Sequence, residues 1–233
     1  MSRANAKVLL FDFGGTLDAE GIPWKDRWVR LSREEGIDAP QPEFDRAFYG
    51  ATDVLEGTIS PNAGFRDTVG QVAHGLATRL GRDVALLRRI GDRFSEESLR
   101  QLARSAALLA RLRERYRIGV VSNFYGNLQA VLDEAGLSPS IGAAIDSTVL
   151  GCKKPDPRIF QAALDALGAS PAEAVFVGDS MRRDMAGARA MGMRHVWLRP
   201  ESADGGGGGG GGGPCCPEDV VIARLSELSD LGL

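Results

Sequence analysis

Polar side chains follow the ends of three apolar, charge-free runs in this sequence. Val8–Phe11 is followed by Asp12, Ile118–Val121 by Ser122 and Asn123, and Ala174–Val177 by Gly178 and Asp179. Runs of this kind are typical of strands that are buried on both faces of a parallel sheet. Ligands bind at the carboxyl edge of such sheets, so we expect these side chains to converge there. Taken alone, Asp12 could equally cap a turn.

A lysine in a proline-restricted loop completes this set of groups. Lys154 precedes Pro155, and Pro157 follows closely, which fixes a rigid turn. Carboxylates with other oxygen ligands suit a hard cation such as Mg²⁺. A hydroxyl, backbone amides and an ammonium suit a phosphate, and a further carboxylate can attack phosphorus. Lys153, the residue before Lys154, is the alternative candidate for this lysine.

The elements that must position these groups fall into two kinds. Apolar residues at helical spacing predict helices over 24–35, 43–55, 84–102 and 106–115, and one that begins at Pro61, with an interruption near Gly91. Strands and helices alternate after residue 104. We therefore expect an α/β fold with a Rossmann-like parallel-sheet core, 1–18 and 104–233, and an inserted α-helical cap, 19–103. The alternative is that these helices only cover one face of the sheet.

Nine consecutive glycines, Gly205 to Gly213, interrupt the core near its end. We expect a flexible surface loop, because such a run has too much backbone freedom to order itself. A phosphate-binding glycine loop is the alternative, but no Lys-Ser/Thr pair follows the run. A short strand at 220–222 and a helix around 225–231 are expected to close the chain.

Composition limits the classes of function. The 233 residues are 43% hydrophobic and 25% charged, as in ordinary globular proteins, and the net charge of −3 gives no case for nucleic acid or an anionic membrane as partner. The three cysteines form neither a disulfide framework nor a zinc motif. Neither a signal pattern nor a membrane-length apolar run is seen. We expect a cytoplasmic protein with free thiols.

Taken together, four segments resemble the signatures of the haloacid dehalogenase superfamily, in its phosphatase branch with a C1 helical cap. They occur in the expected order: Asp12-Phe13-Gly14-Gly15-Thr16-Leu17, Val121-Ser122-Asn123, Lys154-Pro155-Asp156-Pro157 and Gly178-Asp179-Ser180-Met181-Arg182-Arg183-Asp184. The predicted helical insertion also falls where this superfamily places its cap. The resemblance implies an enzyme that hydrolyses a small phosphate monoester, with a phosphorylated metabolite as its partner.

The resemblance also implies roles for the acidic residues. Asp12 would be the nucleophile and would form an aspartyl-phosphate. Asp12, the backbone carbonyl of Gly14 and Asp179 would hold Mg²⁺. Asp184 would be a further carboxylate at this metal site, although a solvated helix carboxylate is the alternative for that residue.

The phosphate-binding roles fall on the remaining motifs. Ser122 and the backbone of Asn123 would bind phosphoryl oxygens. Lys154 would neutralise charge on the nucleophile and the phosphate.

One position departs from the family pattern. These phosphatases carry a second aspartate two residues after the nucleophile, which protonates the leaving group, and here that position is Gly14. Loss of general acid–base catalysis typically costs about 10²–10⁴ in rate. Another acid such as Asp18 or Glu20, or water, could replace it.

Three alternative functions remain open at the level of sequence. The enzyme could be a dehalogenase, or a phosphonate hydrolase that uses Lys25, the single lysine of the cap, to form an imine. It could also bind phosphorylated ligands without turning them over. Trp24, Arg27 and Trp28 could contact a substrate because they follow the nucleophile loop, although packing within the cap is the favoured explanation for both tryptophans.

Overall fold

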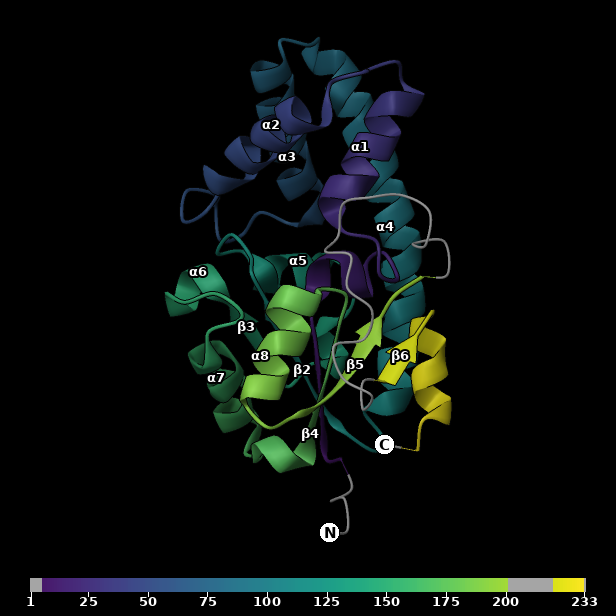
Figure 1. Cartoon of the computed structure of the whole chain (residues 1–233), viewed down its shortest axis with the longest axis vertical. Coiled ribbons are helices and arrows are strands. Elements are labelled where there is room, and N and C mark those ends of the chain that lie inside the picture. The colour runs from purple at the N-terminus through teal and green to yellow at the C-terminus, as the bar shows by residue number, and fades with distance from the viewer. Residues whose placement is uncertain (1–5, 201–219, 233) are drawn as a thin grey trace.

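The computed structural model describes residues 6–200 and 220–232, so the glycine run lies outside the described part of the chain. A parallel six-stranded sheet in the order β3-β2-β1-β4-β5-β6 forms the core (Figure 1). The strands are β1 (Val8–Phe11), β2 (Arg117–Ser122), β3 (Ala143–Asp146), β4 (Ala174–Gly178), β5 (Arg194–Leu198) and β6 (Val220–Ile222). This confirms the predicted α/β class.

The central strand β1 is buried on both faces, as its apolar run predicts. Leu9 and Phe11 pack into the cluster that includes helix residues of the chain's first half, whereas Val8 and Leu10 pack into a second cluster on the opposite face. Helices flank the sheet on both sides: α5 (Leu128–Glu134), α6 (Ser147–Leu150), α7 (Pro157–Leu167) and α8 (Ala186–Ala190). The core therefore has three layers.

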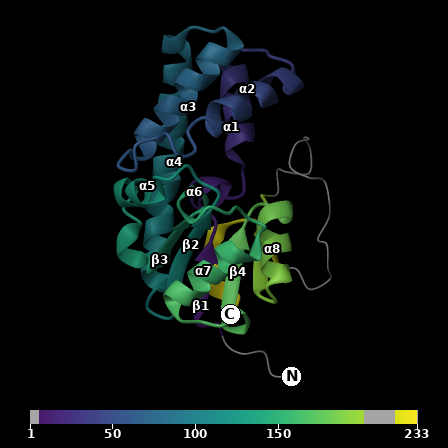
Figure 2. The same cartoon turned by 90° about the vertical axis from the view of Figure 1, so that its left-hand side faces the viewer.

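Four helices are inserted between β1 and β2 and stand at one end of the sheet (Figures 1 and 2). They are α1 (Trp24–Glu34), α2 (Gln41–Asp53), α3 (Phe65–Leu80) and α4 (Val84–Leu112). We call α1–α3 and the part of α4 beside them the cap. Trp28 of α1 stacks on Phe94 of α4, with ring centroids 5.1 Å apart, and this apolar packing holds the cap together. The predicted helical insertion is confirmed.

Three local predictions were wrong. Residues 84–102 and 106–115 do not form separate helices, because α4 runs unbroken for 29 residues. Gly91 does not interrupt it: a Cβ there would lie 3.3 Å from the Cβ of Ala73 on α3, so the glycine allows the two helices to pack closely. Pro61 also does not begin a helix, since α3 starts at Phe65 after a turn.

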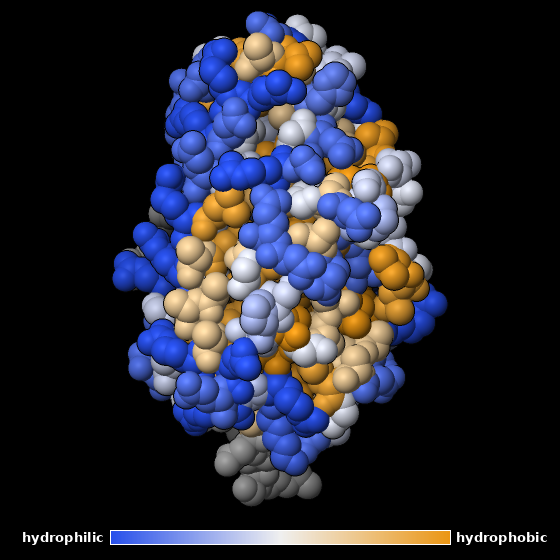
Figure 3. Space-filling view, turned by 180° about the vertical axis from the view of Figure 1, so that it is seen from behind, coloured by the Kyte–Doolittle hydropathy of each residue, from blue (hydrophilic) through white to orange (hydrophobic). Residues whose placement is uncertain are grey.

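The division into a cap at 19–103 and a core remains a proposal, because α4 passes residue 103 without a break. Ser105 of α4 donates a hydrogen bond to the Leu17 carbonyl at 2.6 Å, which joins this helix to the loop after β1. Seen from behind, hydrophilic side chains cover most of the cap, and apolar ones surface mainly over the core (Figure 3).

Among the described helices, none is both long and apolar enough to cross a membrane. Cys152 is a buried free thiol, and the other two cysteines lie outside the described residues.

Candidate active site

The polar residues predicted from the strand ends meet at the carboxyl edge of the sheet. Asp12 follows β1 and Ser122 ends the neighbouring β2, and the Ser122 Oγ donates to Asp12 Oδ1 at 3.1 Å. Asp179 follows β4, the neighbour of β1 on the other side. Since parallel strands place their carboxyl ends together, sequence-distant residues become neighbours without any special loop geometry.

Lys154 reaches this edge from the loop that follows α6. Its Nζ lies 2.6 Å from Asp12 Oδ1 and 2.7 Å from Asp184 Oδ1, and its side chain is 2% exposed. Burial lowers the pKa of Lys154, but the charges of Asp12 and Asp184 outweigh it and raise the pKa above its ordinary value. The ammonium therefore stays charged between two carboxylates. Lys153 instead pairs with Glu56 at the cap, at 2.6 Å.

Asn123 positions the lysine loop. Its side-chain Oδ1 accepts from the Lys154 backbone N–H at 2.7 Å, and its Nδ2 donates to the Lys154 carbonyl at 3.2 Å. This paired contact fixes the Lys154 backbone against the end of β2. The predicted phosphate role concerned only the Asn123 backbone, so the side-chain role was missed.

Three carboxylates form a cluster beside the lysine. Asp12, Asp179 and Asp184 each offer an oxygen, and these oxygens lie within 4.8 Å of one another. Burial raises the pKa of Asp179 well above its usual value, and the charges of Asp12 and Asp184 raise it further. Burial also raises the pKa of Asp184, against the opposing charge of Lys154. Crowded, buried carboxylates of this kind fit a hard divalent cation, which removes their mutual repulsion.

The turn after Asp12 approaches this cluster closely at Gly15. Gly15 has φ +93°, and a Cβ there would lie 2.7 Å from Asp179 Oδ2, so only glycine fits. Thr16, fully buried, donates from its Oγ1 to Asp179 Oδ1 at 2.9 Å. The loop therefore orients Asp179 as well as carrying Asp12.

A pocket of about 630 Å³ opens above these residues, between core and cap. Its lining combines the core residues Asp12, Gly14, Ser122, Asn123, Lys154 and Asp179 with cap residues of α1 and α2. Trp24 belongs to the lining, as one of the three cap residues expected to contact substrate. Arg27 and Trp28 do not: Trp28 is fully buried within the cap, and Arg27 bonds to Asp18 and the Phe94 carbonyl.

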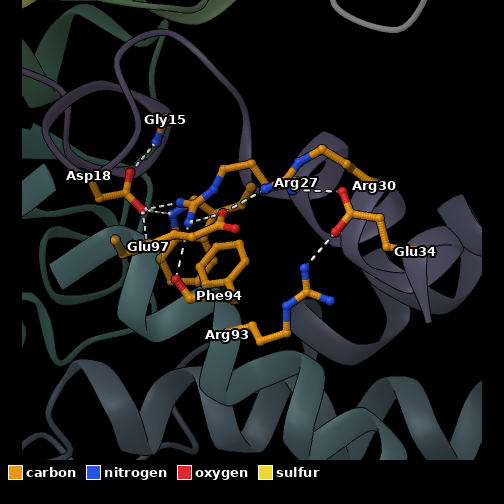
Figure 4. Close-up of polar contacts among 10 residues, drawn as sticks. Gly15, Asp18, Arg27, Arg30, Glu34, Arg93, Phe94 and Glu97 are labelled. Atoms are coloured by element: carbon orange, nitrogen blue, oxygen red, sulfur yellow. Dashed lines mark hydrogen bonds and ion pairs between the residues drawn. The ribbon is translucent and has the colours of Figure 1, made fainter. Parts of the chain in front are cut away.

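Asp18 links the nucleophile loop to the cap (Figure 4). Its carboxylate accepts hydrogen bonds from four donors: Gly15 N, Trp24 Nε1, Arg27 Nη1 and Ser98 Oγ. Asp18 is 1% exposed. Burial raises the pKa of Asp18 above its ordinary value. The charge of Arg27 and the hydrogen bonds that the carboxylate accepts oppose this rise. The sequence carried no signal for this role, because Ser98 lies 80 residues away.

Neither acid that could replace the missing aspartate lines this pocket. The carboxylate of Asp18 accepts hydrogen bonds from donors of the loop and the cap. Glu20 lines a separate cavity of about 430 Å³, together with Arg27 and Arg30. The structure therefore gives no support to the alternative that Asp18 or Glu20 replaces the missing acid.

Trp24 occupies the space beside Gly14. The backbone of Gly14, with φ −76° and ψ 117°, is open to any residue, so its conformation does not require glycine. A Cβ at this position would lie 3.3 Å from Trp24 Nε1, and this indole nitrogen is held by its hydrogen bond to Asp18 at 2.8 Å. The indole thus crowds a Cβ at position 14, and would have to shift by a few tenths of an ångström to admit one.

We expect Gly14→Asp by itself to leave turnover unchanged or lower, because its Cβ crowds the indole, which is held by its hydrogen bond to Asp18. Trp24→Phe keeps an aromatic ring against Phe65 and Phe94 but removes the indole nitrogen that lies beside Gly14. In that background Gly14→Asp is expected to raise kcat on p-nitrophenyl phosphate, by up to about 10²-fold. Steady-state kinetics of both single variants and the double variant test this. Acceleration by Gly14→Asp alone contradicts it.

Comparison with known proteins places this arrangement in a family. Residues 6–192 match the model of the haloacid dehalogenase-like hydrolases. A haloacid dehalogenase-like hydrolase domain-containing protein 3 from Bos taurus is 31% identical over 216 residues, which cover 87% of this chain and 86% of the relative. A phosphoserine phosphatase from Thermus thermophilus is 40% identical over 104 residues, 42% of each chain.

Solved structures share the fold over almost the whole chain. A HAD phosphatase from Thermococcus onnurineus superposes with a TM-score of 0.58 at 23% identity and 97% coverage of both chains. An L-2-haloacid dehalogenase, PA0810, superposes with a TM-score of 0.60 at 23% identity, covering 97% of this chain and 98% of that one. At these identities the likeness concerns the fold. The family match and the full-length relative show that the chain belongs to the haloacid dehalogenase-like hydrolases.

Proposed function

We propose that this protein is a magnesium-dependent phosphohydrolase that cleaves a small phosphate monoester through an aspartyl-phosphate intermediate. One observation carries the proposal: Asp12 lies beside Lys154 at the base of a pocket and within a cluster of three aspartates. A nucleophilic carboxylate, a charged ammonium and a cation-binding acidic cluster are the groups that phosphoryl transfer needs.

Each group has a role in the two steps. A carboxylate oxygen of Asp12 attacks phosphorus, and the bond from phosphorus to the leaving oxygen breaks as the new bond forms. Lys154 and the Ser122 hydroxyl, which both contact Asp12 Oδ1, stabilise charge on the transferred phosphoryl group. Water then attacks the aspartyl-phosphate and releases phosphate, which regenerates Asp12.

The acidic cluster would hold the metal. Asp12, the Gly14 carbonyl, Asp179 and Asp184 are the proposed ligands, with Thr16 orienting Asp179. A bound Mg²⁺ supplies positive charge that offsets the negative charge of phosphate and nucleophile. The raised pKa values of Asp179 and Asp184 support this assignment, because the cluster carries repulsion that a divalent cation relieves.

The leaving oxygen needs a proton that position 14 does not provide. Asp26, on the first turn of α1, lines the pocket, and burial raises its pKa, as does Asp45, against the charge of Lys25. A raised pKa favours a carboxyl that holds a proton. We infer that Asp26 or water supplies this proton.

The names of two similar proteins support phosphorylated metabolites as the class of substrate for this enzyme. Besides the phosphoserine phosphatase, a glyceraldehyde 3-phosphate phosphatase from Pyrococcus abyssi is 35% identical over 104 residues, 43% of each chain. These relatives are named for small phosphate monoesters. The matched segments span less than half of each chain, so the substrates of those proteins give a class and not an identity.

The contacts of Lys25 argue against phosphonate hydrolysis. Lys25 lines the pocket, but its Nζ lies 3.2 Å from Asp45. Burial lowers the pKa of Lys25, while Asp45 and Tyr49 outweigh that effect and raise it. An imine requires a neutral amine, which this pairing disfavours. Carbon–halogen displacement and ligand binding without turnover give no reason for two further aspartates clustered with the nucleophile Asp12.

A phosphate-release screen tests the proposed function. p-Nitrophenyl phosphate, sugar phosphates and nucleotides are incubated with the enzyme, with Mg²⁺ and with EDTA. We expect release from at least one ester in Mg²⁺ and its loss in EDTA, with recovery when Mg²⁺ is added back. No release from any ester contradicts the proposal, and release that is equal in EDTA contradicts its metal dependence.

A further inference from the structure

The pocket contains cations of two kinds, those with a carboxylate partner and those without one. Its lining includes three lysines and two arginines. Lys25 pairs with Asp45, Lys153 with Glu56, and Lys154 with Asp12 and Asp184, at distances of 2.6 to 3.2 Å. For Arg182 and Arg183, no carboxylate of the described residues lies within ion-pair distance. These two guanidinium groups are therefore available to an anion that enters the pocket.

Arg183 is held where the catalytic edge meets the cap. It lies in the turn between Asp179 and Asp184, and its Nε and backbone N–H both donate to Ser180 Oγ at 3.3 Å. Its side chain lines the same pocket as the nucleophile Asp12 and as Tyr49 of α2 in the cap.

This position corresponds to the leaving-group side of the reaction. In an in-line displacement the attacking and leaving oxygens lie on opposite sides of phosphorus. With Asp12 at the base of the pocket, the leaving group must lie towards the cap. The phosphoryl group already has Lys154 and Ser122 beside Asp12, whereas Arg183 lines the pocket together with Tyr49 of the cap.

We propose that Arg183, with Arg182 beside it, binds a second anionic group on the leaving-group part of the substrate. The preferred substrates are then phosphate monoesters whose leaving group carries a carboxylate or a second phosphate. A guanidinium without a carboxylate partner is the group that proteins use to bind planar carboxylates and phosphates through paired hydrogen bonds. This inference rests on the proposed function, whose site it extends.

Acidic residues on the cap restrict where this anion can bind. Asp53 and Glu56 also line the pocket, and Lys153 pairs with Glu56. An anion against α2 would meet the charge of Asp53, so the second anionic group is expected to lie against the core, at the turn that carries Arg182 and Arg183.

Matched pairs of esters test the inference. Glycerol 3-phosphate and 3-phosphoglycerate differ by a carboxylate, and fructose 6-phosphate and fructose 1,6-bisphosphate differ by a second phosphate. We expect the wild type to prefer the more anionic member of at least one pair by about 10-fold or more in kcat/KM, the size of a charge-assisted hydrogen bond. Preference for 3-phosphoglycerate indicates that the second anionic group is a carboxylate, and preference for fructose 1,6-bisphosphate indicates that it is a phosphate.

Arg183→Gln should abolish that preference, chiefly through KM, with a loss on the less anionic ester that is at least about 10-fold smaller than the loss on the more anionic one. Arg111→Gln, an exposed arginine on α4, is the matched control and should preserve the preference. Arg182→Gln shows how much of the effect belongs to the neighbouring arginine. Thermal midpoints establish that the variants are folded.

The possible outcomes separate this inference from the proposed function. An equal loss on both members of each pair overturns the inference, because Arg183 then acts on the transferred phosphoryl group. Equal kcat/KM for both members in the wild type overturns it as well. Failure to hydrolyse all four esters and p-nitrophenyl phosphate contradicts the proposed function itself, and the inference falls with it.

Discussion

Asp12→Asn is expected to abolish phosphate release, with a loss of about 10⁴-fold or more in kcat, because the substitution removes the nucleophilic carboxylate. The fold should survive. Lys154 keeps its contact with Asp184 at 2.7 Å, and the asparagine amide oxygen can still accept from Ser122. The measurement is release from the best ester of the screen in Mg²⁺, with thermal unfolding to verify the fold.

Asp165→Asn is the matched control. Asp165 is an exposed carboxylate on α7 that accepts from Gln161, far from the pocket lining, so its variant should retain full activity. Mass spectrometry of acid-quenched turnover mixtures adds a second readout, since a phosphorylated Asp12 peptide is expected from the wild type alone. A variant with wild-type release, folded and lacking contaminating phosphatase, would falsify the nucleophile assignment.

Asp18→Asn is expected to destabilise the folded protein by about 3–5 kcal/mol, because it removes the buried carboxylate that pairs with the buried Arg27 and leaves only Glu97, 3.8 Å from Arg27 Nη2. The Arg27 Nη1 lies 3.0 Å from Asp18 Oδ2, and the two side chains are 4% and 0% exposed. An asparagine keeps the size of the side chain but replaces one acceptor oxygen by an amide that faces donors. Urea unfolding at neutral pH gives the free energy of unfolding.

A double-mutant cycle isolates the ion pair from the other contacts of Asp18. Adding Arg27→Gln removes the buried charge, so the double variant should be more stable than the sum of the two single effects predicts, with coupling of about 1–3 kcal/mol. Glu34→Gln, which breaks exposed pairs to Arg30 and Arg93, is the control and should leave the urea midpoint almost unchanged. Additive effects of Asp18→Asn and Arg27→Gln contradict a structural ion pair.

The same contacts give Asp18→Asn a second expected effect. Asp18 accepts from the Gly15 N–H at 2.7 Å in the nucleophile loop and from Trp24 and Ser98 in the cap. Loss of this anchor should lower kcat even at temperatures well below unfolding, because a small displacement of the loop misplaces Asp12.

Local patterns in the chain were sufficient to predict much of the fold and to select the candidate residues. Charge-free runs predicted β1, β2 and β4, and helical spacing predicted the insertion between β1 and β2. Strand polarity then predicted the meeting of Asp12, Ser122, Asp179 and Lys154, which lie together at one sheet edge. These predictions succeeded because burial on both faces, periodicity and parallel pairing depend on residues close in sequence. The roles of the site residues stay predictions.

Features that depend on contacts between distant residues were not predictable. The continuity of α4 through Gly91 depends on the approach of α3, and the crowded space beside Gly14 depends on where α1 packs. The role of Asp18 requires Ser98, 80 residues away. Gly14 marks this limit most clearly. The sequence shows that an acid is missing there, whereas only the packing of α1 shows that the Trp24 indole would lie 3.3 Å from a Cβ at that position, because the space around a residue is set by its folded neighbours and not by the local chain.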